Sequence, residues 1–381
     1  MRILIQNGKV LTPQGWLSPA SVVVCDGLIE EITTGNIECF DGECVDASNC
    51  FVVPGFIDLH IHGGGGRDFM EGTVEAFDTV IRTHLKKGTT GILATLASSS
   101  LSMIEQAAEE TTRRMQSANT PIIGLHLEGP YLNPSMAGGQ MPQYIRKPKP
   151  EEYQTLVNHY PCIRRWDAAP EMEGAMDFGA FIFQHGLVAG IAHTTADYPV
   201  MKEAWNHGFT HATHLYNGMK GFHKEGEYKH EGTVESVYLL RDMTVELIAD
   251  GKHVPPAILR LVYQIKGVEN VSLVTDALAP AGCDSAVAFD ERVIIEDGVA
   301  KLRDHSALAG SIATMDRLIR VMVNEAEIPL EDAVRMASES PAKRMGIYHR
   351  KGSLQRGKDA DIVLLDKDLN VRSVWQRGQF V

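Results

Sequence analysis

The stretch Pro54-Gly-Phe-Ile-Asp-Leu-His60-Ile-His62 carries two histidines on a short apolar run, and the glycines Gly63 to Gly66 follow directly. Residues two apart in a β-strand point to the same side, so His60 and His62 aim at one place where the strand ends. Neutral imidazole is a good ligand for zinc, iron and similar ions. The stretch therefore predicts a metal site at the end of a strand. One buried, hydrogen-bonded histidine beside an incidental one would give the same short pattern, so the rest of the chain has to decide.

Helix-like and strand-like segments alternate through the middle of the chain. The helix-like segments are residues 74–88, 102–118, 175–186, 198–208 and 256–267, and the strand-like ones are 89–97, 121–129, 187–193, 209–215 and 271–277. Repeated βα units predict a parallel sheet, either closed into a barrel or doubly wound. Polar candidates recur at the carboxyl ends of many of these strands, and such ends meet at one mouth in a (β/α)8 barrel. The barrel is therefore favoured.

Both ends of the chain differ in composition and pattern from the middle. The first fifty or so residues and the last thirty or so are rich in Val and Ile, with Asn-Gly and Asp-Gly turn signals in the first part. This pattern predicts one small β domain built from both termini. We expect that domain to comprise residues 1–52 and 346–381, and the barrel to comprise residues 53–345.

Composition narrows the class of protein. The chain has 381 residues, 44% hydrophobic and 22% charged, and a formal net charge of -13. That charge argues against a nucleic-acid partner, because phosphates need a basic face. The six cysteines form no C-x-x-C pair, and no signal peptide or membrane-spanning apolar run is recognisable. We expect a soluble cytoplasmic protein with reduced thiols and no membrane partner.

Three further strand ends supply metal-ligand chemistry. Glu128, His193 and His214 would form a site of two histidines and one carboxylate with room for water, which suits catalytic zinc. His60 and His62 could hold a second ion, with Glu128 bridging the two. Each residue alone has a structural explanation, such as a buried histidine or a helix cap, but the coincidence at successive strand ends favours the metal site.

Asp276, in LVTDA, is a carboxylate at another strand end. A carboxylate beside an activated water can accept its proton and later deliver it to a leaving group. The whole set predicts metal-assisted hydrolysis of an amide-like bond. A helix-start role for Asp276 is the alternative. His126 and His211 lie near the site with undecided roles, and the remaining histidines are expected to be bystanders: His84, His159, His185, His207, His305 and His349.

A series of motifs resembles a known family. In order they are PGFIDLHIHG, GLHLEGPYLNP, AAPEM, AGIAHTTAD, THLYNGM, LIADGKH, LVTDALAPAG and LAGSIATM. Together they are similar to the N-acetylglucosamine-6-phosphate deacetylases of the amidohydrolase superfamily, from about residue 50 to beyond residue 340. The closing GSLQRGKDADIVLLD also resembles the superfamily. H-x-H alone is a weak motif, whereas HLEGP, THLYN and TDA-x-APAG together are specific.

The resemblance implies a distorted (β/α)8 barrel with a small β-sandwich-like domain, usually in a homodimer. It implies that Glu128, His193 and His214 hold the catalytic metal and that Asp276 is the general base and acid. Because His60 and His62 are both present, one or two ions are expected, with zinc first and iron, manganese or cobalt as alternatives. The products would be glucosamine 6-phosphate and acetate. The implied substrate-binding residues are Gly139, Gln140, Asn217, Gly218, His253, Leu308, Ala309 and Gly310.

One loop departs from the family pattern. After THLYNGM the family has a short loop with an arginine for the phosphate, whereas this chain has GFHKEGEYKHEG, which is longer and lacks arginine. Lys224, Lys229, His223 and His230 are candidate replacements, although lysine lacks the bidentate fork of arginine. A solvated surface loop is the alternative. The departure leaves the sugar open, so N-acetylgalactosamine 6-phosphate is a second candidate substrate.

Two other functions are weighed against the deacetylase. A cyclic-amide hydrolase of the same superfamily usually bridges two metals with a modified lysine, but Glu128 occupies the strand-end position here. A non-catalytic scaffold would be expected to have lost ligands or the catalytic acid, whereas every expected ligand and Asp276 are present. Both alternatives are therefore less favoured.

Overall fold

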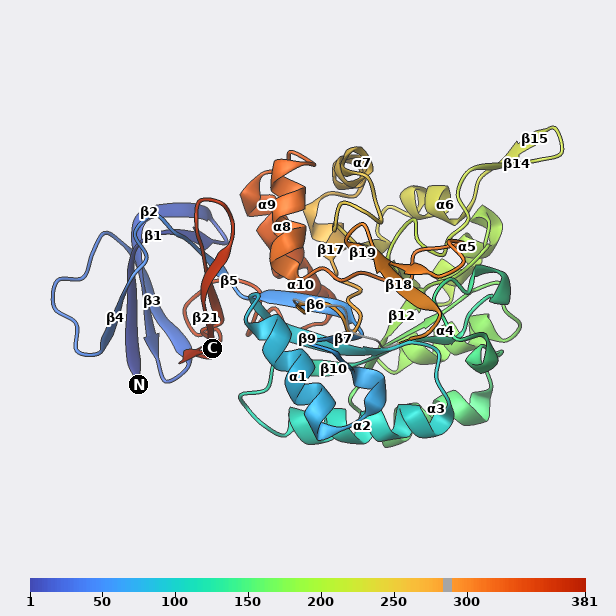
Figure 1. Cartoon of the computed structure of the whole chain (residues 1–381), viewed down its shortest axis with the longest axis horizontal. Helices are drawn as coiled ribbons and strands as arrows, with labels where there is room; N and C mark the ends of the chain where they lie inside the picture. Colours follow the sequence, from blue (N-terminus) through green and yellow to red (C-terminus); the bar gives the residue numbers. More distant parts are fainter. Residues whose placement is uncertain (284–289) are drawn as a thin grey trace.

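The computed structural model describes residues 1–283 and 290–381, and its centre is a parallel sheet with the strand order β17-β16-β13-β12-β11-β10-β9-β6. Figure 1 shows these strands surrounded by helices. The strands are β6 (Phe56–Ile61), β9 (Thr89–Leu96), β10 (Ile122–Tyr131), β11 (Ile163–Ala168), β12 (Val188–Ile191), β13 (Phe209–Ala212), β16 (Thr244–Leu247) and β17 (Val271–Leu273). The strand-like segments predicted in the middle of the chain all coincide with strands of this sheet.

Helices connect the parallel strands and cover the sheet. They are α1 (Val74–Leu85), α2 (Leu101–Met115), α3 (Pro150–His159), α4 (Ala175–Gln184), α5 (Tyr198–Asn206), α6 (Thr233–Leu239), α7 (Pro256–Lys266), α8 (Met315–Asn324), α9 (Leu330–Ala337) and α10 (Glu339–Arg344). Side-chain caps start several of them: Thr73 accepts the backbone N–H of Ala76 at the start of α1. The five predicted helices are confirmed as α1, α2, α4, α5 and α7, and the fold is of the α/β class.

Backbone hydrogen bonds join the end of β6 and the residues after it to the segment that follows β17. The segment after β17 passes along β6, where the backbone N–H of Asp276 donates to the carbonyl of His60 at 2.8 Å. One step further on, the N–H groups of His62 and Gly63 both donate to the carbonyl of Ala277, at 2.9 and 2.8 Å. These bonds bring two strand ends that are far apart in the sequence to one place.

A second sheet is made from both ends of the chain, with the order β22-β21-β20-β5-β1-β2-β3 and β4 paired with β1. Its strands are β1 (Arg2–Thr12), β2 (Gly15–Cys25), β3 (Leu28–Thr34), β4 (Glu43–Asp46), β5 (Phe51–Pro54), β20 (Ile362–Leu365), β21 (Val371–Gln376) and β22 (Gln379–Phe380). In its middle, β5 pairs with β1 in parallel and with β20 in antiparallel. Figure 1 shows this sheet, with both termini, beside α8, α9 and α10.

Short strands and 3-10 helices lie in the segments between the main strands and helices. The paired strands are β7 (Gly63–Gly64) with β8 (Arg67–Asp68), β14 (His223–Glu225) with β15 (Tyr228–His230), and β18 (Val293–Glu296) with β19 (Val299–Leu302). The 3-10 helices are η1 (Phe69–Glu71), η2 (Pro134–Met136), η3 (Pro142–Tyr144) and η4 (Val268–Asn270). In Figure 1 the β14–β15 hairpin extends away from the body of the molecule.

The two faces of the parallel sheet differ in chemistry. On β11, the fully buried Trp166 belongs to the large apolar cluster, whereas its neighbours Arg165 and Asp167 are buried charged groups. Since alternate strand residues point to opposite faces, Arg165 and Asp167 share the other face. That face also carries His126 and Glu128 of β10, so the sheet directs ionisable side chains to one side. Within the described residues no helix combines the length and apolar character needed to span a bilayer.

Candidate metal centre and substrate pocket

Three of the predicted site residues occupy sharp backbone turns just after their strands. His193, His214 and Asp276 have φ of 46°, 28° and 47°, in the left-handed region that non-glycine residues rarely adopt. Each follows a short strand of the parallel sheet by two or three residues. Strained backbone of this kind is concentrated at functional sites, where surrounding structure holds it. The turns bring the side chains of His193 and His214 to Glu128 and that of Asp276 to His62.

Glu128 connects two pairs of histidines through its two carboxylate oxygens. Its Oε1 lies 3.0 Å from Nε2 of His193 and 2.8 Å from Nε2 of His214. Its Oε2 lies 3.5 Å from Nε2 of His60 and 3.3 Å from Nε2 of His62. The carboxylate is therefore placed between two groups of nitrogen donors, as the bridging role predicted from the sequence requires.

Asp276 completes the second group. Its Oδ1 lies 3.1 Å from Nε2 of His62 and 3.5 Å from Nε2 of His60. One donor atom each from His60, His62 and Asp276 fall within 4.8 Å of one another, as do those of His60, Glu128 and His214. The Nε2 atoms of His60 and His62 are 3.2 Å apart, so both could reach one ion.

The electrostatics of this cluster favour a bound cation. Burial by itself would lower the pKa of His60, but the negative charges of Glu128, Glu246 and Asp276 outweigh it and raise the pKa well above its usual range. In the same way, burial is outweighed at His62 by its bonds to Asp276 and Glu128, which raise the pKa of His62 to about 9. Excess negative charge in a buried site attracts a proton or a metal ion alike.

The pKa values of the two carboxylates in the cluster are lowered. Burial would raise the pKa of Glu128, but the charge on His60 and the close contacts with His193 and His214 hold it well below its usual range. For Asp276, burial is likewise opposed by His60 and His62, and the pKa is lowered. Both carboxylates are therefore ionised at neutral pH, the state needed in a metal ligand or a general base.

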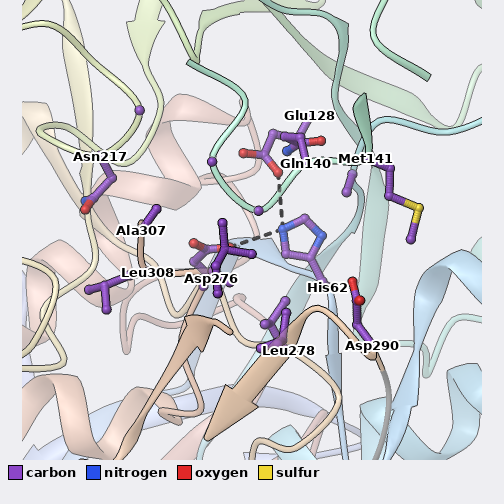
Figure 2. A pocket seen from close by; sticks show the side chains of 18 of the residues that line it. His62, Glu128, Gln140, Met141, Asn217, Asp276, Leu278, Asp290, Ala307 and Leu308 are labelled. Atoms are coloured by element: carbon purple, nitrogen blue, oxygen red, sulfur yellow. Dashed lines mark ion pairs between the residues drawn. The ribbon is translucent and has the colours of Figure 1, made fainter. Parts of the chain in front are cut away.

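A cavity of about 910 Å³ opens over this cluster. Figure 2 shows His62, Glu128 and Asp276 in its middle, with Asn217, Ala307 and Leu308 on one side and Met141 and Asp290 on the other. His62, His193, His214, Glu128 and Asp276 line it, whereas His60 is fully buried and is not part of the lining. All eight substrate-binding residues implied by the family resemblance also line it: Gly139, Gln140, Asn217, Gly218, His253, Leu308, Ala309 and Gly310.

His253 presents an unused nitrogen to this pocket. Its Nδ1 lies 2.9 Å from Oδ2 of Asp250, and its buried Nε2 has no hydrogen-bond partner among the described residues. Because a carboxylate only accepts, Nδ1 carries the proton, and Nε2 of the neutral ring is then an acceptor. A buried acceptor without a partner is suited to a hydroxyl group of a ligand.

Arg292, which sequence reasoning missed, ties two walls of the pocket together. It precedes β18 and donates to the backbone carbonyls of Gln140 and Gly139, both at 3.1 Å. Asp290 holds the same guanidinium, with a shortest contact of 2.7 Å. Gln140 in turn accepts the backbone N–H of Ser98 at 2.7 Å. In the sequence, Arg292 looks like an ordinary charged residue next to an exposed strand, and no motif marks it.

Lys224 and Lys229, the predicted phosphate ligands, do not line this pocket. They face each other across the exposed β14–β15 hairpin, together with His223 and His230. Nζ of Lys229 is 5.8 Å from the ring centre of the exposed Phe222. Within one chain, therefore, the hairpin does not bring these side chains to Glu128 and Asp276.

His126 and His211, left undecided by the sequence, are buried and bonded away from the pocket. Nε2 of His126 is 2.8 Å from Asp167, and Nδ1 of His211 is 2.7 Å from the hydroxyl of Thr244. Neither lines the cavity.

Comparison with known proteins places these observations in a family. The model of the Amidohydrolase family matches residues 51–381. N-acetylglucosamine-6-phosphate deacetylase of Bacillus subtilis (strain 168) is 30% identical and covers 99% of this chain and 96% of its own. N-acetylgalactosamine-6-phosphate deacetylase of Escherichia coli O157:H7 is also 30% identical, covering 100% and 99%.

A solved structure resembles the whole chain. It is a mutant of N-acetyl-D-glucosamine-6-phosphate deacetylase from Mycobacterium smegmatis in complex with N-acetyl-D-glucosamine-6-phosphate. The two chains share 31% sequence identity and a TM-score of 0.91, with 100% of this chain and 99% of the other covered.

Proposed function

Because the chain belongs to the amidohydrolase family, we propose that it is a metal-dependent hydrolase that removes the acetyl group from N-acetylglucosamine 6-phosphate. The observation that carries this proposal is the placement of Glu128 between two histidine pairs, with Asp276 beside them and a cavity above. The products are glucosamine 6-phosphate and acetate.

We extend the proposal to the architecture. The hydrogen bonds between β6 and the segment after β17 support a closed, distorted (β/α)8 barrel over residues 53–345. The sheet shared by both ends of the chain supports a small β domain of residues 1–52 and 346–381. In a barrel of this kind the carboxyl ends of the strands form the active-site mouth, which is where the predicted ligands lie.

The donor set fits a divalent metal. Glu128 Oε1, His193 and His214 would hold one ion, and Glu128 Oε2, His60, His62 and Asp276 would surround a second. His193 Nδ1 lies 2.7 Å from the carbonyl of Met136, so Nδ1 donates and the Nε2 lone pair is free to bind metal. Imidazole and carboxylate ligands suit zinc, with iron, manganese and cobalt as alternatives.

The chain's own residues account for the proton transfers of hydrolysis. A bound divalent ion would polarise the acetamide carbonyl and lower the pKa of a water. Asp276, ionised in this environment, accepts the proton of the attacking water at a carboxylate oxygen. It then delivers that proton to the amine nitrogen as the carbon–nitrogen bond breaks. One carboxylate serves both steps because it is protonated only between them.

The remaining lining residues bind the sugar in this proposal. His253 accepts a hydroxyl proton at Nε2, and Asn217 and Gly218 contact the sugar or its phosphate, with Gly139 and Gln140 on the opposite wall. Leu308, Ala309 and Gly310 line the pocket beside the acetamide. A phosphorylated sugar does not cross a bilayer unaided, which supports a cytoplasmic enzyme.

Phosphate binding is assigned to the β14–β15 hairpin, with Lys224 and Lys229 as the cations. In one chain these lysines lie outside the pocket, so the assignment requires the predicted homodimer, in which the projecting hairpin would reach the pocket of a second copy. N-acetylgalactosamine 6-phosphate is the second candidate substrate, because a deacetylase of that sugar is equally similar in sequence.

Acetate release tests the proposal. N-acetylglucosamine 6-phosphate, its galactosamine epimer and unphosphorylated N-acetylglucosamine are incubated with the enzyme and with enzyme stripped of metal. Metal-dependent turnover that is fastest on the first substrate is expected. Faster turnover of the epimer would transfer the assignment to N-acetylgalactosamine 6-phosphate. No acetate from any of the three would contradict the deacetylase.

A further inference from the structure

Glu246 contacts two of the residues assigned to the metal centre, although it lies outside the pocket. This side chain of β16 is fully buried. Its Oε2 lies 3.1 Å from Nδ1 of His60 and accepts the backbone N–H of His214 at 3.2 Å. Its Oε1 accepts from the guanidinium of Arg165. Both oxygens of Glu246 are therefore committed to donors.

The charged partner of Glu246 also serves a second carboxylate. Arg165 is shared with Asp167, which it contacts through Nε and Nη2, both at 2.9 Å. Nε2 of His126 lies 2.8 Å from the same Asp167. A buried carboxylate is costly unless donors satisfy it, and Glu246 meets the guanidinium of Arg165, the backbone N–H of His214 and the ring of His60.

Glu246 also decides which nitrogen of His60 carries the proton. Both of its oxygens already accept hydrogen bonds, Oε1 from the guanidinium of Arg165 and Oε2 from the backbone N–H of His214, so Glu246 presents acceptors only. Nδ1 of His60 must therefore be the donor in their contact. In the neutral ring this leaves the lone pair on Nε2, the atom that faces His62 at 3.2 Å.

We propose that Glu246 is a positioning residue for the second metal ion, because it fixes the tautomer and direction of His60. The nitrogen lone pair of His60 then points to the place that His62 and the Oε2 side of Glu128 share. The ion assigned to His193 and His214 is affected differently, because Glu246 contacts the backbone N–H of His214 and not its ring, and Met136 fixes the ring of His193. The inference rests on the proposed function, since it takes the metal centre as given.

Glu246→Gln tests the proposal because an amide has one acceptor and one donor end. Arg165 can only donate, so the amide oxygen turns to Arg165 and the amide NH₂ turns to His60. The backbone N–H of His214 also loses its acceptor in this variant, but the His214 ring is not contacted by Glu246. Nδ1 of His60 must then accept, which moves the ring proton to Nε2, where it blocks metal binding. Loss of such an outer partner typically weakens metal binding about 10- to 100-fold. Zinc added to metal-free protein, in competition with a fluorescent chelator, should show two ions per wild-type chain and a 10- to 100-fold weaker second ion in the variant.

Asp58→Asn is the matched control. Asp58 is fully buried on the same strand as His60 and also changes from acid to amide, but it contacts only the backbone of His60, at 3.2 Å, together with Thr275. The affinity of the Asp58→Asn variant for the second zinc ion should stay within about threefold of that of wild type. In a His60→Gln background, Glu246→Gln should add little further loss, because the ring through which it acts is gone.

Nitrogen NMR of the histidine rings provides a measurement on the unmutated, zinc-loaded protein, so the test survives if the variant fails to fold. The ring signals of His60 are identified by their absence from the spectrum of His60→Gln. In the wild-type protein they should show a proton on Nδ1 of His60, and a proton on Nε2 would overturn the proposal. The proposal would also be overturned if the wild-type chain bound only one zinc ion, or if Glu246→Gln weakened the binding of both ions equally. If the wild-type chain binds one zinc ion and still releases acetate, only the inference about Glu246 is refuted. If it binds two ions whose second affinity depends on Glu246 but releases no acetate, only the proposed deacetylase function is refuted.

Discussion

Asp276 places its Oδ1 atom 3.1 Å from Nε2 of His62, where the segment after β17 passes along β6. This contact holds the carboxylate at the edge of the donor cluster and inside the pocket, within reach of a substrate. Of the carboxylates in the cluster, Glu128 is enclosed by four histidines, whereas Asp276 faces the histidines on one side only. The geometry therefore separates a bridging carboxylate from one free to exchange protons.

Asp276→Asn should reduce kcat by a factor of about 10³ while the protein keeps its fold, because an amide cannot accept and return a proton. The measurement is acetate release at saturating substrate, with circular dichroism to confirm folding. Substantial activity, above about a tenth of the wild-type rate, would remove Asp276 from the acid–base role.

Glu128→Gln should lower the affinity for both ions, since each oxygen of Glu128 faces a different histidine pair. The metal content of purified protein, measured by mass spectrometry, should fall well below that of wild type. Glu171→Gln is the control, because Glu171 bonds to Thr194 and Thr195 close to His193 without contacting the donor atoms. Equal metal loss in both variants would show a general effect on the loop.

Arg292→Lys should raise KM several-fold with a smaller change in kcat. An ammonium group lacks the planar fork with which Arg292 reaches the carbonyls of Gly139 and Gln140 together with Asp290. Arg303→Lys should leave both constants unchanged, because the exposed Arg303 lies opposite Arg292 in the same hairpin but directs its side chain to the carbonyl of Glu291. An unaltered KM in Arg292→Lys would show that the contacts of Arg292 with Gly139 and Gln140 are not needed for substrate binding.

Lys224→Ala and Lys229→Ala should raise KM for N-acetylglucosamine 6-phosphate far more than for the unphosphorylated sugar, if the hairpin supplies the phosphate contact. Light scattering should show a dimer in the same samples. A monomer with unchanged KM for the phosphorylated sugar would exclude the hairpin and direct attention to Arg67 and Arg292, the arginines that line the pocket.

Acid should destabilise the protein through His84, which is fully buried on α1 with Nε2 donating to the carbonyl of Gly63 at 3.0 Å. Burial lowers the pKa of His84 to about 4. The unfolded chain binds this proton near pH 6.5, so the contribution of His84 is complete above that pH and is lost as the pH falls toward 4. Between pH 7 and pH 5 the loss is about 2 kcal/mol.

Urea unfolding of metal-free protein at pH 7 and pH 5 measures this effect. His84→Gln, whose amide can still donate to Gly63, should lose about 2 kcal/mol less than wild type over the same interval. An identical pH dependence in the two proteins would show that other groups control acid stability.

The sequence predicted the part of the site that local pattern controls. His60, His62, Glu128, His193, His214 and Asp276 each end an apolar segment, and a parallel sheet brings such ends together, so their convergence could be expected. The tight left-handed turns at His193, His214 and Asp276 were not predicted, because the backbone there is determined by tertiary contacts.

The supporting residues could not be predicted for a different reason. Arg165 lies in a run that reads as a half-exposed strand, and Glu246 in one that reads as an ordinary strand, yet both are fully buried. Their burial is possible only because the two meet across the fold, and contacts between strands so distant in sequence leave no local periodicity. The position of Lys224 and Lys229 on a projecting hairpin could not be predicted either, since a favourable residue type does not reveal where in the fold the residue lies. Their role as phosphate ligands stays a prediction.

The sheet shared by both ends of the chain affects the order in which the protein can form during synthesis. One edge of β5 is paired with β1, which is made early, but its other edge is filled only by β20, which is made after every strand of the parallel sheet. Exposed strand edges are templates for aggregation. While the ribosome translates the intervening residues, the edge of β5 is therefore unprotected, and it becomes covered only when residues 362–365 emerge.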